Sequence, residues 1–451
     1  MKKALPLLLL FFSAQIIQAQ TCKGLSLGTK TVYPAPGSPY SAPPAGYSPV
    51  FINYVGRHGA RHMTKDLRES DTYRLLQRAD SVRALSADGQ KLWQMVQRLA
   101  GMERKEIKNI SSLGKSEQQG IGRRMVEKFP AVFNTAHPSL NVTVTKEVRT
   151  VQSADAFLVG LQQKITAPVM RRQVNDTILR FYDLSPAYQQ FKEGGPWTAT
   201  VLQLETAEGY SQLSRRTANR FFTTAFANNI KPADQQTFAA DVVSYANILY
   251  SLPAEIREAG MGDRDLLFTQ FFNCDELKKF SLVDNAEEFL VKGPGTDPSG
   301  IQVRIAVPLL IDFIRSTDNA IQAKPYNAEL RFTHAEAIAP FAVLMNIQGA
   351  STPARTGTGI AKAWDASKVI PLSANIQWIL YKKDNRDEYL VQFLLNEKEA
   401  RIEGLSPKQF PYYDWRAVRK FYTDRLAKLQ ASLDTDGLAY LKGLAGPKSE
   451  P

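Results

Sequence analysis

The sequence predicts an α/β protein whose central mixed, mostly parallel sheet is flanked by helices. Three apolar or β-branched stretches, 49–55, 141–148 and 328–333, are typical of buried strands, and each runs into a loop or the start of a helix. The long segment 176–322 instead carries its apolar side chains mostly at helical spacing. Strands that alternate with helical segments favour the α/β class.

The chain divides into four predicted parts. Residues 1–19 are a signal peptide and residues 20–48 an extended arm rich in Pro, Ser, Gly and Ala. Segments 49–175 and 323–451 together make the α/β domain, and residues 176–322 form a helical subdomain inserted into it. A helical region that merely covers one face of the sheet is the alternative. We expect the functional site in the cleft between the domain and the insertion.

Further elements are predicted on both sides of the insertion. Residues 66–99 have apolar side chains at helical spacing and are expected to form two helices that pack on the sheet. Segments 375–381 and 388–395 surround a charged turn and are expected to form a hairpin. Residues 413–433 have the pattern of an amphipathic helix.

The first residues predict export from the cytoplasm. Lys2 and Lys3 precede a short apolar stretch, and Ala19 ends a sequence suited to signal-peptide cleavage. The apolar stretch is shorter than the ~20 residues that a membrane-spanning helix needs, and no later stretch is longer and equally apolar. We therefore expect a periplasmic or secreted protein with no stable membrane insertion.

Two cysteines, Cys22 and Cys274, are present in the chain. Cys22 lies soon after the predicted cleavage site, but Gln20 and Thr21 are a poor match to the small residues that lipidation requires. We therefore do not expect a lipid anchor at Cys22. In an oxidising compartment the two cysteines can pair or stay free, and the sequence leaves both possibilities open.

The charge of the chain indicates an anionic partner. The formal net charge is +12, and removing Lys2 and Lys3 with the signal peptide leaves 12 − 2 = +10. Such an excess raises the local concentration of polyanions. Nucleic acid is not expected, because the basic residues are scattered and form no run interleaved with aromatic residues. A small, highly phosphorylated molecule fits the charge equally well. No oligomeric state follows from the sequence.

The stretch from Arg57 to Arg61 is the first candidate for a functional site. It reads Arg-His-Gly-Ala-Arg and follows the predicted strand 49–55, so His58 falls where a strand opens into a loop. Ligands of open α/β folds bind at such strand ends. Two guanidiniums beside an imidazole suit a phosphate group, with Gly59 allowing a tight turn. On these residues alone, a surface turn with solvated arginines is an equally good interpretation.

Two further strand ends carry complementary side chains. Arg149 follows the predicted strand 141–148, and His334 and Glu336 follow the strand 328–333. Taken singly, Arg149 is best explained as a solvated surface arginine, and His-Ala-Glu as a structural histidine beside a helix-capping carboxylate. Taken together, these groups could surround a phosphoryl group. Three of the four histidines, His58, His62 and His334, lie in these motifs.

These motifs together resemble the histidine acid phosphatase family. The resemblance rests on Arg57 to Arg61 with Thr64-Lys65, on Leu113-Gly114 with Gln118, on Arg149 with Ser153-Ala154 and Ala156-Phe157, and on His334-Ala335-Glu336. The His-Ala-Glu form and the run from Leu394 to Lys398 are similar to the multiple inositol polyphosphate phosphatase branch. The match spans residues 27–405 in order. Met63 stands where the family usually has proline, which we expect to loosen the loop.

The resemblance implies a fold and a reaction. The fold would be like that of phosphoglycerate mutase. His58 would attack phosphorus and become phosphohistidine, while Glu336 would act as general acid. Four residues would bind the transferred phosphoryl group, namely Arg57, Arg61, Arg149 and His334. Lys65, and with weaker support His62, would contact other phosphates of the substrate. No metal and no other cofactor is expected, because arginines supply the positive charge.

The leading hypothesis is therefore a phosphatase that removes phosphates from myo-inositol hexakisphosphate (phytate) and lower inositol phosphates. A broad acid phosphatase acting on sugar phosphates or nucleotides would share the whole site and differ in the outer pocket. A protein that binds polyanions without turning them over is the non-enzymatic alternative. The order in which ring phosphates are removed does not follow from the sequence.

Overall fold

The computed structural model describes residues 22–446 with the exception of residues 24, 38 and 263. The predicted signal peptide, residues 1–19, lies outside the described residues. Within the described part of the chain, no helix is long and apolar enough to cross a membrane.

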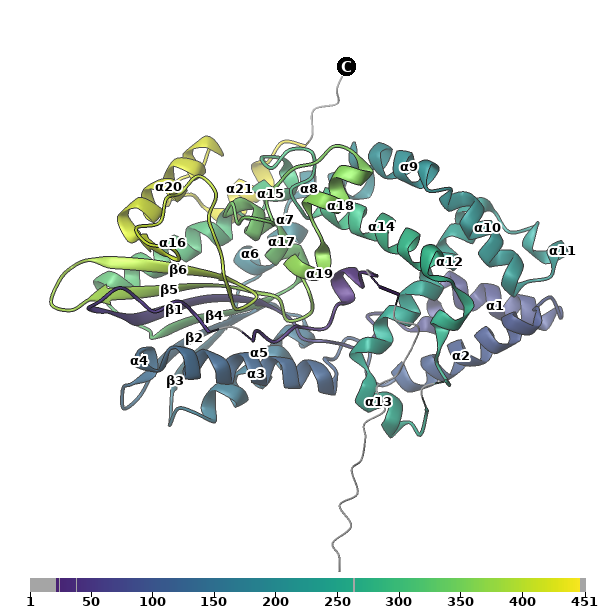
Figure 1. Ribbon diagram of the computed structural model, residues 1–451, viewed down its shortest axis with the longest axis horizontal. Coiled ribbons are helices and arrows are strands. Elements are labelled where there is room, and N and C mark those ends of the chain that lie inside the picture. Colours follow the sequence, from purple (N-terminus) through teal and green to yellow (C-terminus); the bar gives the residue numbers. More distant parts are fainter. Residues whose placement is uncertain (1–21, 24, 38, 263, 447–451) are drawn as a thin grey trace, which may run out of the picture.

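A single mixed sheet forms the larger half of the molecule (Figure 1). Along the sheet the strands follow the order β3-β2-β4-β1-β5-β6-β7, and β8 also pairs with β6. The first four of these are mutually parallel, β5 runs antiparallel to β1, and the rest pair antiparallel. The strands are β1 (Tyr47–Arg57), β2 (Ser139–Val144), β3 (Val169–Val174), β4 (Ala328–Thr333), β5 (Asn375–Lys383), β6 (Tyr389–Leu395), β7 (Lys398–Glu399) and β8 (Tyr412–Asp414).

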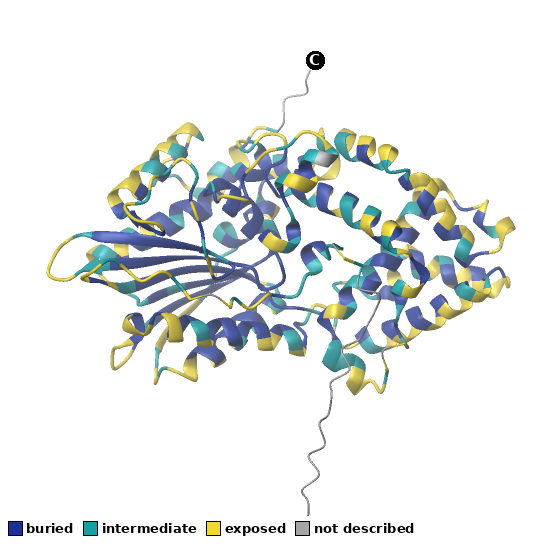
Figure 2. Cartoon of the chain, in the orientation of Figure 1, coloured by how far each residue is buried: buried dark blue, intermediate teal, exposed yellow. Residues whose placement is uncertain are grey.

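Helices cover both faces of this sheet, which confirms the predicted α/β class. One face packs against α3 (Ser112–Lys128), α4 (Pro130–Phe133) and α5 (Val148–Gln162). The opposite face packs against α16 (Val307–Gln322), α17 (Ala335–Leu344) and α20 (Trp415–Lys428). The central strands are almost wholly buried, whereas the outer faces of the helices are exposed (Figure 2). The hairpin β5-β6 is also confirmed.

The smaller half of the molecule is built from helices. The described residues between 176 and 322 contain no strand and form α6 (Asp176–Leu179), α7 (Phe181–Leu184), α8 (Pro186–Gly194), α9 (Trp197–Ala207), α10 (Tyr210–Phe221), α11 (Thr224–Ala227), α12 (Pro232–Ile248), α13 (Pro253–Glu258), α14 (Cys274–Val291), α15 (Ile301–Arg304) and α16. Of these, α6 and α16 pack against the sheet and not in the smaller half (Figure 1). Whether this segment is an independent inserted subdomain remains a prediction.

The helices α1 (Asp71–Ser81) and α2 (Ala87–Glu103) do not pack on the sheet, so that expectation was wrong. They lie against α10 and α12 in the helical half (Figure 1). The Ser86 N–H donates to the Phe221 carbonyl at 3.0 Å, which fixes the start of α2 against the end of α10. The amphipathic pattern determines which face of a helix is buried, but it does not determine which element covers that face.

The arm that precedes β1 crosses between the two halves. It contains the short 3-10 helix η1 (Gly28–Lys30) and otherwise runs as an irregular extended chain up to Gly46. A disulfide joins Cys22 to Cys274 at the start of α14, which answers the question that the sequence left open. The Cys22 sulfur is therefore not available for a lipid.

Candidate active site

The ends of two neighbouring parallel strands bring His58 and His334 together. In the register of β1 with β4, Arg57 is paired with Thr333, so the next residue of each strand is a histidine. The His58 N–H donates to the Thr333 carbonyl at 2.9 Å, and the centroids of the two imidazole rings are 5.5 Å apart. Residues almost three hundred positions apart thus form one site at the carboxyl edge of the sheet.

The His58 side chain is held in a form that can act as a nucleophile. Its Nδ1 lies 2.9 Å from the carbonyl oxygen of Gly59. A carbonyl can only accept, so Nδ1 carries the proton and Nε2 keeps a free lone pair. Burial and the charge of Arg57 hold the pKa of His58 well below its ordinary value. The imidazole is therefore neutral at physiological pH.

The loop that carries His58 is fixed by the amino-terminal ends of α3 and α5. The carboxylate of Glu117 accepts the Ala60 N–H at 2.9 Å, and the Ser111 N–H donates to the Ala60 carbonyl at 2.9 Å. The Ser153 hydroxyl accepts the Gly59 N–H at 3.0 Å. These bonds leave the backbone beside His58 little freedom to move.

Arg57 and Arg61, on either side of His58, carry positive charges that no neighbouring carboxylate in the described chain pairs with. Arg57 Nη1 donates to the carbonyls of Thr29 at 2.8 Å and Ile370 at 2.7 Å. Burial and the charge of Arg57 lower the pKa of Arg61 to about 10. Neither guanidinium forms an ion pair with a carboxylate among the described residues. Such a pair of cations is suited to bind an oxyanion.

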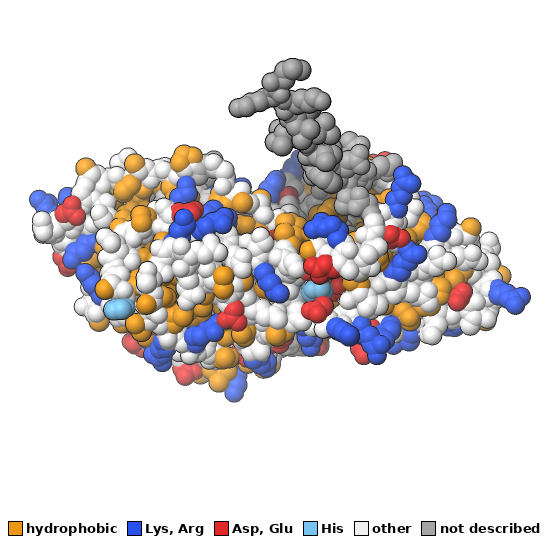
Figure 3. Space-filling view, turned by 90° about the horizontal axis from the view of Figure 1, so that it is seen from below, with side chains coloured by type: hydrophobic (Ala, Val, Ile, Leu, Met, Phe, Trp, Pro, Cys, Tyr) orange, Lys and Arg blue, Asp and Glu red, His pale blue; other side chains and the backbone are white. Residues whose placement is uncertain are grey.

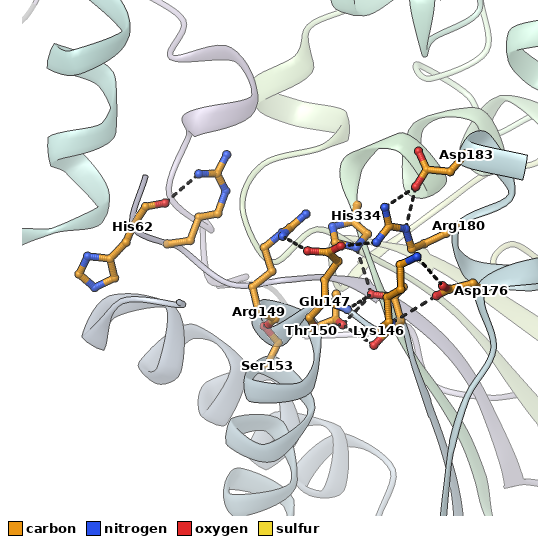
Figure 4. Close-up of polar contacts among 12 residues, drawn as sticks. His62, Lys146, Glu147, Arg149, Thr150, Ser153, Asp176, Arg180, Asp183 and His334 are labelled. Carbon is orange, nitrogen blue, oxygen red and sulfur yellow. Dashed lines mark hydrogen bonds and ion pairs between the residues drawn. The ribbon is translucent and has the colours of Figure 1, made fainter. Parts of the chain in front are cut away.

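Arg149 lies in the first turn of α5 and not at the end of a strand, which corrects the predicted element. β2 ends at Val144, and the hydroxyl of the next residue, Thr145, lies 2.8 Å from Thr150 Oγ1. The Arg149 guanidinium donates to Glu147 Oε2 at 2.9 Å. Arg180, at the end of α6, contacts the other oxygen of the same carboxylate (Figure 4).

Two buried guanidinium N–H groups at the site have no hydrogen-bond partner in the described part of the chain. They are Arg57 Nε and Arg149 Nε. A buried donor without a partner costs about 1–3 kcal/mol, more when it is charged. An anion bound between these arginines would satisfy both donors.

His334 and Glu336 come from the start of α17. His334 is 2 % exposed and caps the helix, and its Nε2 lies 3.2 Å from Thr145 Oγ1. Burial and the charge of Arg149 lower the pKa of His334 to about 3, so this imidazole is also neutral. Glu336 lies in the first turn of the same helix, where the backbone N–H groups favour a negative charge.

The Glu336 carboxylate forms an ion pair with Lys292, just beyond the end of α14, at 3.2 Å. Burial acts to raise the pKa of Glu336, but Lys292 and other positive charges outweigh burial and hold the pKa below its ordinary range. The side chain is 34 % exposed, so it faces open space. Without a ligand, Glu336 is therefore ionised.

A cavity of about 320 Å³ opens beside Glu336. Its cationic lining residues are Arg149, Arg180, Lys192 and Lys292. Four carboxylates line it as well, namely Asp183, Glu287, Glu288 and Glu336, and they include partners of Arg180 and Lys292. The cavity lies between the start of α17, the helices α7 and α8, and the end of α14. Anionic groups of a ligand could replace these carboxylates as partners of the four cations.

The family model of the histidine phosphatase superfamily (branch 2) matches residues 50–396. The chain belongs to this superfamily. The matched range begins in β1 and ends just after β6, so it includes His58, Arg149, His334 and Glu336.

Named relatives of this histidine phosphatase include the Gallus gallus multiple inositol polyphosphate phosphatase 1, which is 24% identical over 399 residues, or 85% of this chain and 83% of that protein. The crystal structure of the Bifidobacterium longum multiple inositol polyphosphate phosphatase, in complex with inositol hexasulfate, superposes with a TM-score of 0.75 and 21% identity. It covers 91% of this chain and 99% of that chain. The D. castellii phytase gives a TM-score of 0.62 at 14% identity, covering 89% and 85% of the two chains.

His62 turns away from the other predicted site residues in this histidine phosphatase, and the role of Lys65 stays a prediction. His62 is buried, and its Nδ1 lies 2.9 Å from Glu103 Oε1 on α2, so its ring points away from His334 (Figure 4). Lys65 is exposed and makes no ion pair with a described residue. The Met63 N–H, which a proline would lack, donates to Glu103 Oε2 at 2.5 Å. Met63 thus ties the loop to α2, contrary to the expected loosening.

Three cations at the site were missed by the sequence analysis, namely Lys30, Arg180 and Lys292. Lys30 ends η1, directly after the Thr29 carbonyl that accepts from Arg57. Burial and the charges of Arg61 and Arg57 lower the pKa of Lys30 to about 8. None of the three lies in a recognisable motif, so no local signal marks them.

Close packing at Gly114 gives a test of how the loop is held. A Cβ at Gly114 would lie 2.0 Å from the Ala60 carbonyl oxygen, so Gly114→Ala must push the nucleophile loop away from α3. We expect a loss of about 1–3 kcal/mol in the free energy of unfolding in urea. Hydrolysis of p-nitrophenyl phosphate should fall as well. Gly101→Ala on α2 is the matched control, because its Cβ would meet no atom within 4 Å. Equal behaviour of the two variants would contradict this account.

Proposed function

We propose that this protein hydrolyses phosphomonoesters of myo-inositol hexakisphosphate and lower inositol phosphates through a phosphohistidine intermediate. The observation that carries the proposal is the pairing of His58 with His334 at the ends of β1 and β4, among the arginines Arg57, Arg61 and Arg149. The names of the relatives support the substrate class, since two of those proteins are inositol polyphosphate phosphatases and one is a phytase.

In the first step, His58 Nε2 forms a bond to phosphorus as the phosphorus bond to the inositol oxygen breaks. Nε2 is suited to this attack because Nδ1 holds the proton against the Gly59 carbonyl. Arg57, Arg61 and Arg149 stabilise the charge on the equatorial oxygens in the transition state. Glu336 gives its proton to the departing alkoxide, which is otherwise a poor leaving group.

In the second step, water attacks phosphorus and the bond to Nε2 breaks, which releases inorganic phosphate and restores His58. The ionised Glu336 accepts a proton from that water.

The first step requires a protonated Glu336, although this carboxylate is ionised in the empty site. The several negative charges of a bound inositol phosphate would draw Lys292 away and raise the pKa of Glu336. Binding would thereby prepare the acid.

Lys30 is proposed to bind a second phosphate of the substrate. It directly follows Thr29, whose carbonyl accepts from Arg57, and its ammonium forms no ion pair with a carboxylate among the described residues. We expect Lys30→Met to raise the KM for phytate roughly threefold to tenfold and to change kcat little, because one charged contact is lost before and during reaction. Lys23→Met, on an exposed residue of the same arm, is the control. An unchanged KM in initial-rate assays would exclude this role.

The substrate class can be tested by separating the products formed from phytate over time. We expect successive lower inositol phosphates, with kcat/KM for phytate well above that for glucose 6-phosphate or AMP. Comparable values for all three would indicate a broad acid phosphatase instead. Binding of phytate without release of phosphate would indicate a polyanion-binding protein.

We also propose that the protein acts in the periplasm or outside the cell. The Cys22–Cys274 disulfide supports this, because structural disulfides persist in oxidising compartments. A nucleic-acid partner remains unexpected. On the face drawn in Figure 3, Lys and Arg side chains are scattered among Asp and Glu and form no continuous stripe.

A further inference from the structure

Lys292 is shared by two carboxylates at the edge of the cavity. Its Nζ lies 2.8 Å from Glu288 Oε2 and 3.2 Å from Glu336 Oε1. Glu288 lies one helical turn before Lys292 on α14, whereas Glu336 comes from the other half of the molecule. All three side chains line the same cavity. The general acid of the proposed reaction is thus connected to a second carboxylate through one ammonium group.

Glu288 is an i,i+4 partner of Lys292, but it also brings a negative charge to the cavity proposed to bind phosphate groups. It is an anion where anionic substrate must enter, and it lies close enough to Arg57 and Lys30 to affect the pKa of both. Such a charge opposes substrate binding by Coulomb repulsion. Because Glu288 pairs with Lys292, it can offset this cost by making the chemical step faster.

We propose that Glu288 is a positioning residue that controls the protonation of Glu336 by drawing Lys292 partly away from it. The inference rests on the role of Glu336 in the proposed function. If Lys292 paired with Glu336 alone, its full charge would favour the ionised carboxylate. Glu288 divides that charge between two partners and leaves the acid easier to protonate.

Other charged groups around Glu336 also affect its pKa. The charged and titratable side chains around it come from several elements: Lys292, Glu287 and Glu288 at the end of α14, Arg57 and Arg61 after β1, Arg149 of α5, Arg180 after α6, Tyr182 and Asp183 of α7, Tyr188 and Lys192 of α8, and His334 at the start of α17. Most of these charges are positive and favour ionised Glu336. Glu288 is the carboxylate that opposes them through a direct contact with Lys292.

The test compares kcat of Glu288→Gln with that of the wild type across pH, because kcat reports the pKa of Glu336 in the substrate complex and leaves out the change in substrate binding. The rate follows the protonated fraction of Glu336, and this fraction falls as pH rises through the pKa. Removing the Glu288 charge lowers that pKa by roughly half a unit to one unit. We therefore expect a variant to wild-type ratio near one at the most acidic pH and about threefold to tenfold below one at higher pH. The ratio cancels the titration of the substrate itself.

Two classes of substrate, with poor and good leaving groups, separate this effect from general damage. Phytate and glycerol 2-phosphate both release poor leaving groups and should show the pH-dependent ratio. p-Nitrophenyl phosphate needs little protonation and should show a ratio near one at every pH. A ratio below one that does not vary with pH, or an equal loss on p-nitrophenyl phosphate, would overturn the proposal. Failure to hydrolyse phytate would refute the proposed substrate alone, because glycerol 2-phosphate still reports on Glu336.

A double-mutant cycle tests the dependence on Lys292. In a Lys292→Met background, Glu288→Gln should change the ratio by less than about twofold, because the shared ammonium is absent. If Glu288→Gln lowered kcat at higher pH by the same factor with Lys292 as with Met at position 292, a role through Lys292 would be overturned. Glu287→Gln is the matched control, since it removes a charge from the same cavity wall without an ion pair to Lys292 among the described residues. Its ratio should stay closer to one.

Discussion

His58→Ala is expected to lower the release of phosphate from phytate by roughly 10⁴-fold or more. The variant loses the Nε2 lone pair, and no other described side chain in the site can take its place, since the His334 ring is fixed against Thr145. The measurement is the initial rate of phosphate release at a pH where the wild type is most active. Quenching the wild type in alkali during turnover should also trap phosphate on the peptide that contains His58.

The control for this variant is His137→Ala, because His137 is exposed on the loop before β2 and makes no contact with the site. It should retain the full rate. Substantial hydrolysis by His58→Ala would show that the phosphoryl group does not pass through this imidazole. Phosphate trapped on a different peptide would lead to the same conclusion.

The sheet and its two histidines could be predicted because the signal is local. The apolar stretches before His58 and His334 match β1 and β4, and the polar motif follows each strand end directly. Once the two strands lie parallel and adjacent, the pairing of Arg57 with Thr333 places the histidines side by side. The error at Arg149 has a local cause as well. Val144 and Val148 both suit a strand, and only the Thr145–Thr150 contact shows where the strand ends.

The rest of the site depends on tertiary contacts that no local pattern reveals. Lys30 and Lys292 are two of 56 basic residues, and neither lies in a distinctive motif. His62 shows the reverse case: it lies within the motif, but Glu103 on α2 binds its imidazole. The packing of α2 against the helical half, which the sequence analysis assigned to the sheet, brings that carboxylate to the loop.

Glu336→Gln tests the general acid, and we expect its effect to depend on the leaving group. Phosphate release from phytate should fall by about 10²–10⁴-fold in kcat, because the amide cannot protonate the inositol alkoxide. The KM for phytate should not rise, since the substitution removes an anion from the cavity. The fall of activity that accompanies ionisation of Glu336 as pH rises should also disappear.

p-Nitrophenyl phosphate provides the internal control for this variant, because nitrophenolate leaves without a proton. Its hydrolysis by Glu336→Gln should fall far less than that of phytate, while His58→Ala should lose both activities. The second step adds a further distinction: if Glu336 also assists the attack of water, phosphohistidine should accumulate in Glu336→Gln during turnover of p-nitrophenyl phosphate. Equal losses on the two substrates, with no phosphohistidine accumulated, would assign Glu336 to substrate binding instead of proton transfer.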